Sequence, residues 1–541
     1  MTSFSKTILL LFIIATAFVG CEGDYNSIVD ANMDRHPIPD TDVEFSAGSA
    51  DFSNFVAIGN SLTAGYMDGA LYNNGQEQSL AALLAVQFEA VGGTEEFNQP
   101  DINSVNGFNT IVDNNGNGVV LGRFKLDTSI PGPSPTVNGE TIQPYTGSAS
   151  ELNNFGVPGV QVGQLLTPDA ANPSSPAFNP YYARFASSPG TSTVLSDAIS
   201  ANPTFFSLWI GSNDVLGYAT SGATNPNILT SQQDFQTRFE LTVNTLLTQT
   251  SANGVVANIP PFLATPLFRA VPYNAVELDE ATAGQLNEAF SLINNVFDGM
   301  AEDNFLFSDF TQEDADRRKV TYQAGNNPIL IVDPSLDDLS DEFDQLEQFN
   351  QITPEQRAAL QPYVQSRPMV VDNQVGPELV LLSAGAVLGT PAVQGDPNTA
   401  IGVAVPLGAQ YTLTAENIVE IETARGTFNG IINAVVSANS DRLAFYDTNS
   451  PSSAFSDIFG LDGSEPGIMQ DGVFLNPDFS PNGVFSTDGI HPNSRGNAIL
   501  ANEFIEAIEE KFSANIPEAD VLALPSVALC AGDCASQQGG S

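Results

Sequence analysis

Basic residues are scarce in this chain of 541 residues, in which 16 lysines and arginines stand against 63 aspartates and glutamates, giving a formal net charge of −47 at pH 7. A surface with so few positive charges repels the phosphates of nucleic acids and of anionic lipid headgroups. The composition therefore predicts that no nucleic acid is a partner. Hydrophobic residues make up 42% of the chain, which is ample for a core, and the length allows roughly two to four domains or one enlarged domain.

Histidine is rarer still, because the whole chain has two, His36 and His491. Two distant histidines cannot supply the ligands of a catalytic zinc ion. The segment from Asp113 to Gly118 matches the first half of a calcium loop, but Phe124 stands where that loop needs a bidentate glutamate. We therefore expect no metal site.

The first twenty residues have the pattern of a processing segment. Lys6 precedes an apolar run, Ile8 to Val19, that is too short to span a membrane in the mature protein, and Gly20-Cys21 follows. This ending resembles a bacterial lipoprotein signal, which implies cleavage before Cys21 and attachment of lipid to its thiol. The alternative is an ordinary cleaved signal with a chance cysteine. We expect export, with residues 1–20 removed, a flexible tether over 21–52, and a membrane anchor at Cys21, most simply in the outer membrane of the cell envelope.

The two other cysteines, Cys530 and Cys534, lie in the predicted C-terminal tail, 514–541. Outside the cytosol two such thiols are able to pair. Their loop is so short that a disulfide would add little stability. The sequence leaves open whether they form one.

A serine follows an abrupt strand end near the start of the predicted folded region. The apolar run Phe55 to Ile58 stops at Gly59, Ser61 comes two residues later, and helix-forming sequence resumes from Gln76 to Glu89. This order places a hydroxyl at the carboxyl end of a parallel strand and near a helix amino terminus, where negative charge is stabilised. The alternative is an ordinary strand-to-helix turn that the serine only caps.

Strands and helices alternate over much of the remaining chain. Buried strands are expected at 204–210, 254–259 and 443–447, with helices between them. The pair Thr230 and Gln233 has the spacing of a capping box, so we expect a helix to begin near Thr230. Such alternation predicts an α/β fold with a parallel central sheet and helices on both faces.

The alternation is lost from about 265 to 412, which predicts an insertion or small subdomain. The α/β domain is then formed by two segments, 53–264 and 413–513.

His491 lies in a turn directly before the last predicted helix, Asn493 to Phe512. An activated serine needs an imidazole to accept its proton, and the imidazole needs a carboxylate to fix its tautomer and stabilise its charge. Asp488 stands three residues before His491, across a turn that contains Gly489. The alternative is a structural histidine at a helix start. One imidazole in the whole folded region, at this spacing from a carboxylate, favours a catalytic role.

Four short blocks together resemble the SGNH hydrolases, also called GDSL esterases/lipases. The blocks, in order, are Gly59-Asn60-Ser61-Leu62, Gly159, Gly211-Ser212-Asn213-Asp214, and Asp488-Gly489-Ile490-His491. The resemblance covers about 53–258 and 412–512 and says little about the region between. Asn60 replaces the aspartate that is usual beside the nucleophile, and a Ser-His-Asp triad does not need that carboxylate. No G-x-S-x-G elbow occurs, which disfavours a separate serine-hydrolase family.

The resemblance implies a flavodoxin-like three-layer fold and a mechanism through an acyl-enzyme. Ser61 would attack an ester carbonyl, His491 would take its proton, and Asp488 would orient the imidazole. The oxyanion would be held by the backbone N–H groups of Ser61 and Gly159 and by the Asn213 side chain. No metal or organic cofactor is required.

The expected substrate is an ester of a lipid or an acylated sugar, and the sequence does not choose between them. Two alternatives stay open: a carbohydrate O-acetylesterase, and a surface binding or adhesion lipoprotein that retains a hydrolase scaffold.

Overall fold

The computed structural model describes residues 44–94, 96–112, 118–126, 133–135, 139–303 and 305–529. The predictions about the signal segment, Cys21, most of the tether, most of the calcium-like loop (113–117) and the pair Cys530 and Cys534 lie outside the described residues. By its internal contacts the chain divides into Met1–Phe45 and Ser46–Ser541. The second unit holds the sheet. No described helix is long and apolar enough to cross a membrane.

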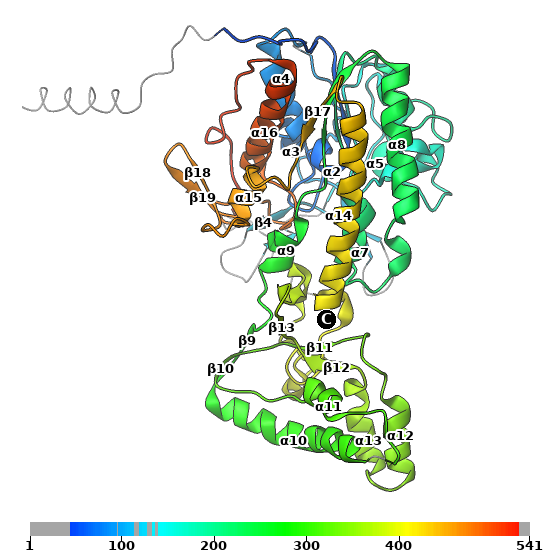
Figure 1. Cartoon of the computed structure of the whole chain (residues 1–541), viewed down its shortest axis with the longest axis vertical. Helices are drawn as coiled ribbons and strands as arrows, with labels where there is room; N and C mark the ends of the chain where they lie inside the picture. Colours follow the sequence, from blue (N-terminus) through cyan, green and yellow to red (C-terminus); the bar gives the residue numbers. More distant parts are fainter. Residues whose placement is uncertain are drawn as a thin grey trace, which may run out of the picture. The chain divides into compact units, whose positions relative to one another are not determined.

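A five-stranded parallel sheet forms the centre of this unit (Figure 1). Its strands, in spatial order, are β17 (Leu443–Tyr446), β8 (Asn253–Ala257), β7 (Phe205–Trp209), β1 (Phe55–Gly59) and β6 (Asn154–Gly156). The prediction of an α/β fold around a parallel sheet is confirmed. The first strand of the chain, β1, lies inside the sheet: β6 is next to it on one side, and β7, β8 and β17 follow in turn on the other. This is the flavodoxin-like order, in which the order of the strands reverses between β1 and β7.

Helices cover both faces of the sheet and complete three layers. Val56 and Ile58 of β1 belong to one core, whereas Phe55 and Ala57 belong to the other, because successive side chains of a strand point to opposite faces. The first core is closed by α6 (Val194–Ser200), α8 (Gln232–Gln249) and α14 (Ala415–Ala438), and the second by α4 (Leu80–Glu89), α15 (Ala454–Phe459) and α16 (Ser494–Phe512).

The start of α8 differs from the prediction. Its N-cap is Ser231, whose Oγ accepts a hydrogen bond from Asp234 N at 3.1 Å. Thr230, which was expected to cap with Gln233, instead donates its hydroxyl to Oδ1 of the buried Asp214 at 2.8 Å. A buried carboxylate needs donors, and this demand outweighs the local capping pattern.

The helix predicted over 76–89 is likewise two helices, α3 (Asn73–Glu77) and α4. Ser79 lies between them in extended backbone, and its Oγ caps α4 by accepting from Ala82 N at 3.1 Å. The helix that follows His491 begins where expected, since Asn493 caps α16 by accepting from Gly496 N at 3.0 Å.

The folded body extends beyond the expected limits of 53 and 513. Ser46 N donates to Asn515 O at 2.8 Å, and the ring of Phe52 stacks on Phe88 with centroids 4.2 Å apart. Val521 is fully buried in the same core. The residues just before β1 and those just after α16 therefore pack together against α4 and α16.

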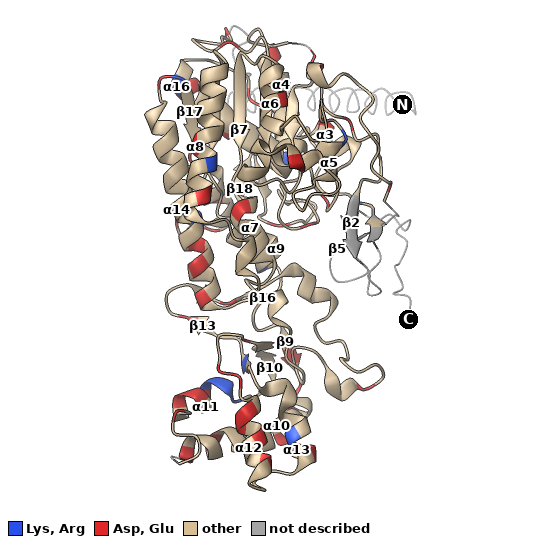
Figure 2. Cartoon of the chain, turned by 90° about the vertical axis from the view of Figure 1, so that its right-hand side faces the viewer, with Lys and Arg blue, Asp and Glu red and all other residues tan. Residues whose placement is uncertain are grey.

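The segment between α9 (Pro266–Arg269) and α14 builds a separate core. It contains four α-helices and paired short strands: α10 (Glu280–Glu302), α11 (Gln312–Arg318), α12 (Ser340–Gln348), α13 (Pro354–Leu360), β9 (Val276–Leu278) with β10 (Gly325–Asn327), and β11 (Leu330–Val332) with β12 (Ser366–Pro368). Phe297, Ile331 and Phe343 lie at the centre of this core. These four strands pair with one another and none of them joins the central sheet. Acidic residues are spread over its helices and along α14 (Figure 2).

A buried ion cluster fastens this segment to α14. Arg367 lies 2.6 Å from Asp333 Oδ2 and 2.6 Å from Glu378 Oε1, and the three side chains are 4%, 1% and 0% exposed. Glu378 Oε1 also accepts from the backbone N of Ala415, the first residue of α14, at 3.2 Å. Charges so deeply buried are tolerated because each is paired and hydrogen-bonded.

We expect Arg367→Met to lower the free energy of unfolding by about 3–5 kcal/mol, because two buried carboxylates then lack a counter-charge. The matched control is Lys319→Met, since Lys319 pairs with the more exposed Asp298 at 2.8 Å and such surface pairs contribute at most about 1 kcal/mol. Urea unfolding of the three proteins measures the difference. Equal losses in the two variants would contradict the role given to the cluster.

Candidate active site

Ser61 lies at the carboxyl end of β1, as the sequence predicts. It is the first residue of the short helix α2 (Ser61–Ala64), and Asn60 caps that helix by accepting from Leu62 N at 3.0 Å. The amide oxygen of Asn60 thus performs the capping task that a carboxylate would perform. A side chain at Gly59 would come within 2.5 Å of the Trp209 carbonyl oxygen, so only glycine lets the ends of β1 and β7 approach this closely.

The reversal of strand order between β1 and β7 brings the third predicted block, Gly211 to Asp214, to Ser61. The chain leaves β7 through Gly211 and enters α7 (Asn213–Thr220). In open α/β sheets the carboxyl ends of two such strands border the crevice where ligands bind. Ser61 and Asn213 accordingly line the same cavity.

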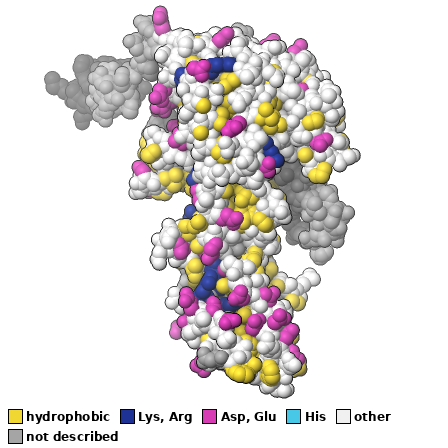
Figure 3. Space-filling model, turned by 45° about the vertical axis from the view of Figure 1, so that its right-hand side comes forward, with side chains coloured by type: hydrophobic (Ala, Val, Ile, Leu, Met, Phe, Trp, Pro, Cys, Tyr) yellow, Lys and Arg dark blue, Asp and Glu magenta, His cyan; other side chains and the backbone are white. Residues whose placement is uncertain are grey.

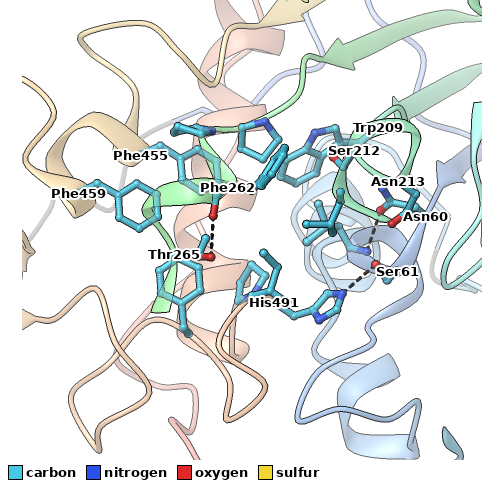
Figure 4. Close-up of a pocket in the computed structure, with 17 residues that line it drawn as sticks. Asn60, Ser61, Trp209, Ser212, Asn213, Phe262, Thr265, Phe455, Phe459 and His491 are labelled. Carbon is cyan, nitrogen blue, oxygen red and sulfur yellow. Dashed lines mark hydrogen bonds between the residues drawn. The ribbon is translucent and has the colours of Figure 1, made fainter. Parts of the chain in front are cut away.

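His491 joins this cavity from the far end of the chain (Figure 4). Its Nε2 lies 2.9 Å from Ser61 Oγ, although the two residues are 430 positions apart. Its Nδ1 lies 2.9 Å from Asp488 Oδ2. The structure thus places the three residues in one continuous chain of hydrogen bonds, with distances suited to proton transfer.

Asp488 is held by backbone donors as well as by the imidazole. Its Oδ1 accepts from the N–H groups of Ile490 and His491 at 3.0 and 2.9 Å, and its Oδ2 accepts from Gly69 N at 3.0 Å. Burial alone raises the pKa of this carboxyl, but the charge of His491 and these hydrogen bonds outweigh it and lower the pKa to about 2. The group is therefore ionised at neutral pH.

A second carboxylate, which the sequence analysis missed, lies behind the Asp488 turn. Asp68 Oδ1 accepts from the backbone N and the hydroxyl of Thr487 at 3.0 and 2.8 Å, and its Oδ2 accepts from the Tyr72 hydroxyl at 2.7 Å. Its own N–H donates to Ser486 Oγ at 3.0 Å. Burial raises the pKa of Asp68. Its φ of 55° is unusual for a non-glycine residue, and the adjoining Gly69 is the one local signal of a turn there.

The three predicted oxyanion donors differ in how the structure places them. Asn213 Nδ2 donates to Val160 O at 2.9 Å, which fixes the orientation of the amide. Gly159, with a φ of 76°, lies in the turn that Val160 closes and does not line the cavity itself. Among the described residues neither the backbone N–H of Ser61 nor that of Gly159 has a hydrogen-bond acceptor, so neither group is already engaged.

Comparison with known proteins supports the same chemistry. The family model described as GDSL-like Lipase/Acylhydrolase matches residues 55–504. The comparisons with curated proteins and with solved structures found no match. The family match spans most of the chain and includes Ser61, Asn213 and His491. The chain therefore belongs to the GDSL-like lipases/acylhydrolases, which are ester hydrolases.

Proposed function

We propose that the protein hydrolyses carboxylic esters through an acyl-enzyme intermediate on Ser61. The observation that carries the proposal is the unbroken hydrogen-bonded chain from Ser61 Oγ through the His491 ring to Asp488. A serine, an imidazole and an ionised carboxylate in this order are the parts that nucleophilic acyl transfer requires.

The reaction follows from this geometry. Ser61 Oγ bonds to the ester carbonyl carbon as its proton passes to His491 Nε2. The imidazolium, stabilised by Asp488, then gives that proton to the leaving alcohol oxygen as the carbon–oxygen ester bond breaks. Water next attacks the acyl carbon, loses a proton to His491, and releases the carboxylic acid as Ser61 recovers its hydrogen.

The negative oxygen of the tetrahedral intermediate needs donors that are already oriented. The N–H groups of Ser61 and Gly159 and the amide of Asn213 are the proposed set. Because Asn213 is held by Val160 O, its second N–H bond needs little reorganisation to reach substrate. Loss of one such donor typically raises the barrier by about 3 kcal/mol. A surface binding or adhesion protein would not need these groups in reactive alignment, so we favour the enzyme.

Replacing Ser61 or His491 with alanine is expected to reduce turnover of a chromogenic acetyl ester by on the order of 10⁶-fold, because nucleophile or base is lost. Thermal unfolding should stay near that of the wild type. Ser200→Ala is the control, since Ser200 is exposed and outside the cavity. Wild-type rates in either active-site variant would refute the mechanism.

Asp68→Ala is expected to lower kcat by on the order of 10²-fold with little change in KM, because the Asp488 turn loses its support and the imidazole shifts. Asp68→Asn should recover most of this activity, since its amide can still accept from Thr487 and can donate to the Tyr72 oxygen. Steady-state kinetics of both variants measures kcat and KM separately. An equal loss in kcat for the two variants would show that the positioning role is wrong.

We further propose that the protein is exported and anchored to the cell envelope by lipid on Cys21, a proposal supported by the amino-terminal sequence alone. Cells expressing the full chain should incorporate labelled palmitate into it, whereas Cys21→Ser should remain unlabelled and leave the membrane fraction. Ser61→Ala should be labelled like the wild type. Palmitate in the Cys21→Ser protein would exclude this anchor.

A further inference from the structure

The cavity beside Ser61 has apolar walls. Its sides are formed by Leu62, Trp209, Leu216, Phe262, Phe455 and Phe459, with prolines between them. Two of the polar groups near these walls are already engaged: the Thr265 hydroxyl donates to Phe262 O at 2.7 Å, and Asn60 Oδ1 caps α2. Ser212 Oγ, which is buried at the cavity, has no hydrogen-bond partner among the described residues. A sugar or a phosphate in this space would give up its hydrogen bonds to water and regain few of them.

The cavity is also small, with a volume of about 40 Å³. One water-sized group needs roughly 10–15 Å³ on the same measure, so there is room for about three or four such groups. Stacked aromatic rings form part of its wall. The ring centroids of Phe455 and Phe459 are 6.0 Å apart, and those of Phe459 and Phe485 are 5.6 Å apart. Phe455 and Phe459 lie across the cavity from Ser61 (Figure 4), and rings packed in this way do not yield easily to a longer chain.

The position of the cavity suits the acyl side of an ester. The acyl carbon stays bonded to Ser61 Oγ after the alcohol has left, so its chain needs a lasting site next to the serine. Leu62 adjoins the nucleophile, and Leu216 lies one turn after Asn213 in α7. A chain held between these two side chains would keep its carbonyl oxygen near the donors. The alcohol must depart past His491 and be replaced by water, which apolar walls would hinder.

We infer that this cavity binds the acyl group and admits only short aliphatic acyl groups, from acetyl to about butyryl. The inference rests on the proposed function and narrows it: the substrates are short-chain esters, acetyl esters included, and not long-chain lipids.

A series of p-nitrophenyl esters from acetyl to palmitoyl tests the chain length. We expect kcat/KM to be greatest between acetyl and butyryl and to fall at least roughly tenfold by octanoyl, since each misfit methylene carries a penalty of this order. A maximum at octanoyl or longer overturns the pocket inference and leaves the ester hydrolase intact. If no ester in the series is hydrolysed faster than by Ser61→Ala, both the proposed function and the inference fail.

Two variants test the walls. Phe459→Ala should lengthen the cavity and raise the ratio of kcat/KM for hexanoyl to that for acetyl ester by roughly tenfold, whereas Leu216→Phe should lower the butyryl to acetyl ratio. The matched control is Phe178→Ala, because Phe178 is 37% exposed and lies outside the cavity. Ratios unchanged in both wall variants, with folding retained by circular dichroism, would overturn the inference.

A second series of esters tests which part of the substrate the cavity binds. In this series the acetyl group is kept and the alcohol grows from ethyl to octyl. We expect kcat/KM to change by less than about threefold across it. A steep decline with alcohol length, together with a flat acyl series, would show that the cavity binds the alcohol and would refute the assignment.

Discussion

The hydrogen bond between Ser61 Oγ and His491 Nε2 is the contact on which the proposed chemistry depends, and it joins residues 430 positions apart. It forms because the starts of two helices are tied together. Asn497 Nδ2 in α16 donates to Gln78 O at 3.0 Å, just before α4, and Ser494 Oγ donates to the Gln78 side chain. Since α4 and α16 share one core, burial of apolar surface far from the cavity fixes the position of the imidazole.

The segment between the two parts of the sheet contributes to the same alignment. Leu267 N donates to Gly489 O at 2.7 Å, inside the turn that joins Asp488 to His491. Gly489 has a φ of 77°, and a side chain there would come within 3.0 Å of Leu267 N and 3.1 Å of Leu382. The turn is thus held from one side by Asp68 and from the other by Leu267. Leu267 lies in α9, which packs against the first core of the sheet, so the start of this segment contributes to the position of His491.

The sequence was sufficient to predict those site residues that depend on local spacing or belong to a residue type that is rare in the chain. With two histidines in the chain, Asp488 and His491 could be paired by their separation alone, and the strand before Ser61 was evident from its apolar run. Asp68 was missed because its partners in the Asp488 turn lie about 420 residues away, and no local pattern records such a distance. The capping box at Thr230 was wrong because the Thr230 hydroxyl donates to the buried carboxylate of Asp214, and the burial of Asp214 is a result of the fold that the spacing of Thr230 and Gln233 does not show.

Surface charge and the apolar cavity favour the same class of substrate. Acidic side chains are spread over the visible face, and the basic ones gather in few places (Figure 3). With a net charge of −47, the field around the protein repels anions. A neutral short-chain ester is not repelled by this field, whereas an anionic phospholipid is repelled. Hydrolysis converts the neutral acyl group into a carboxylate, which loses its fit to an apolar cavity and is repelled by the surface, so the same two features that admit the substrate promote release of the product.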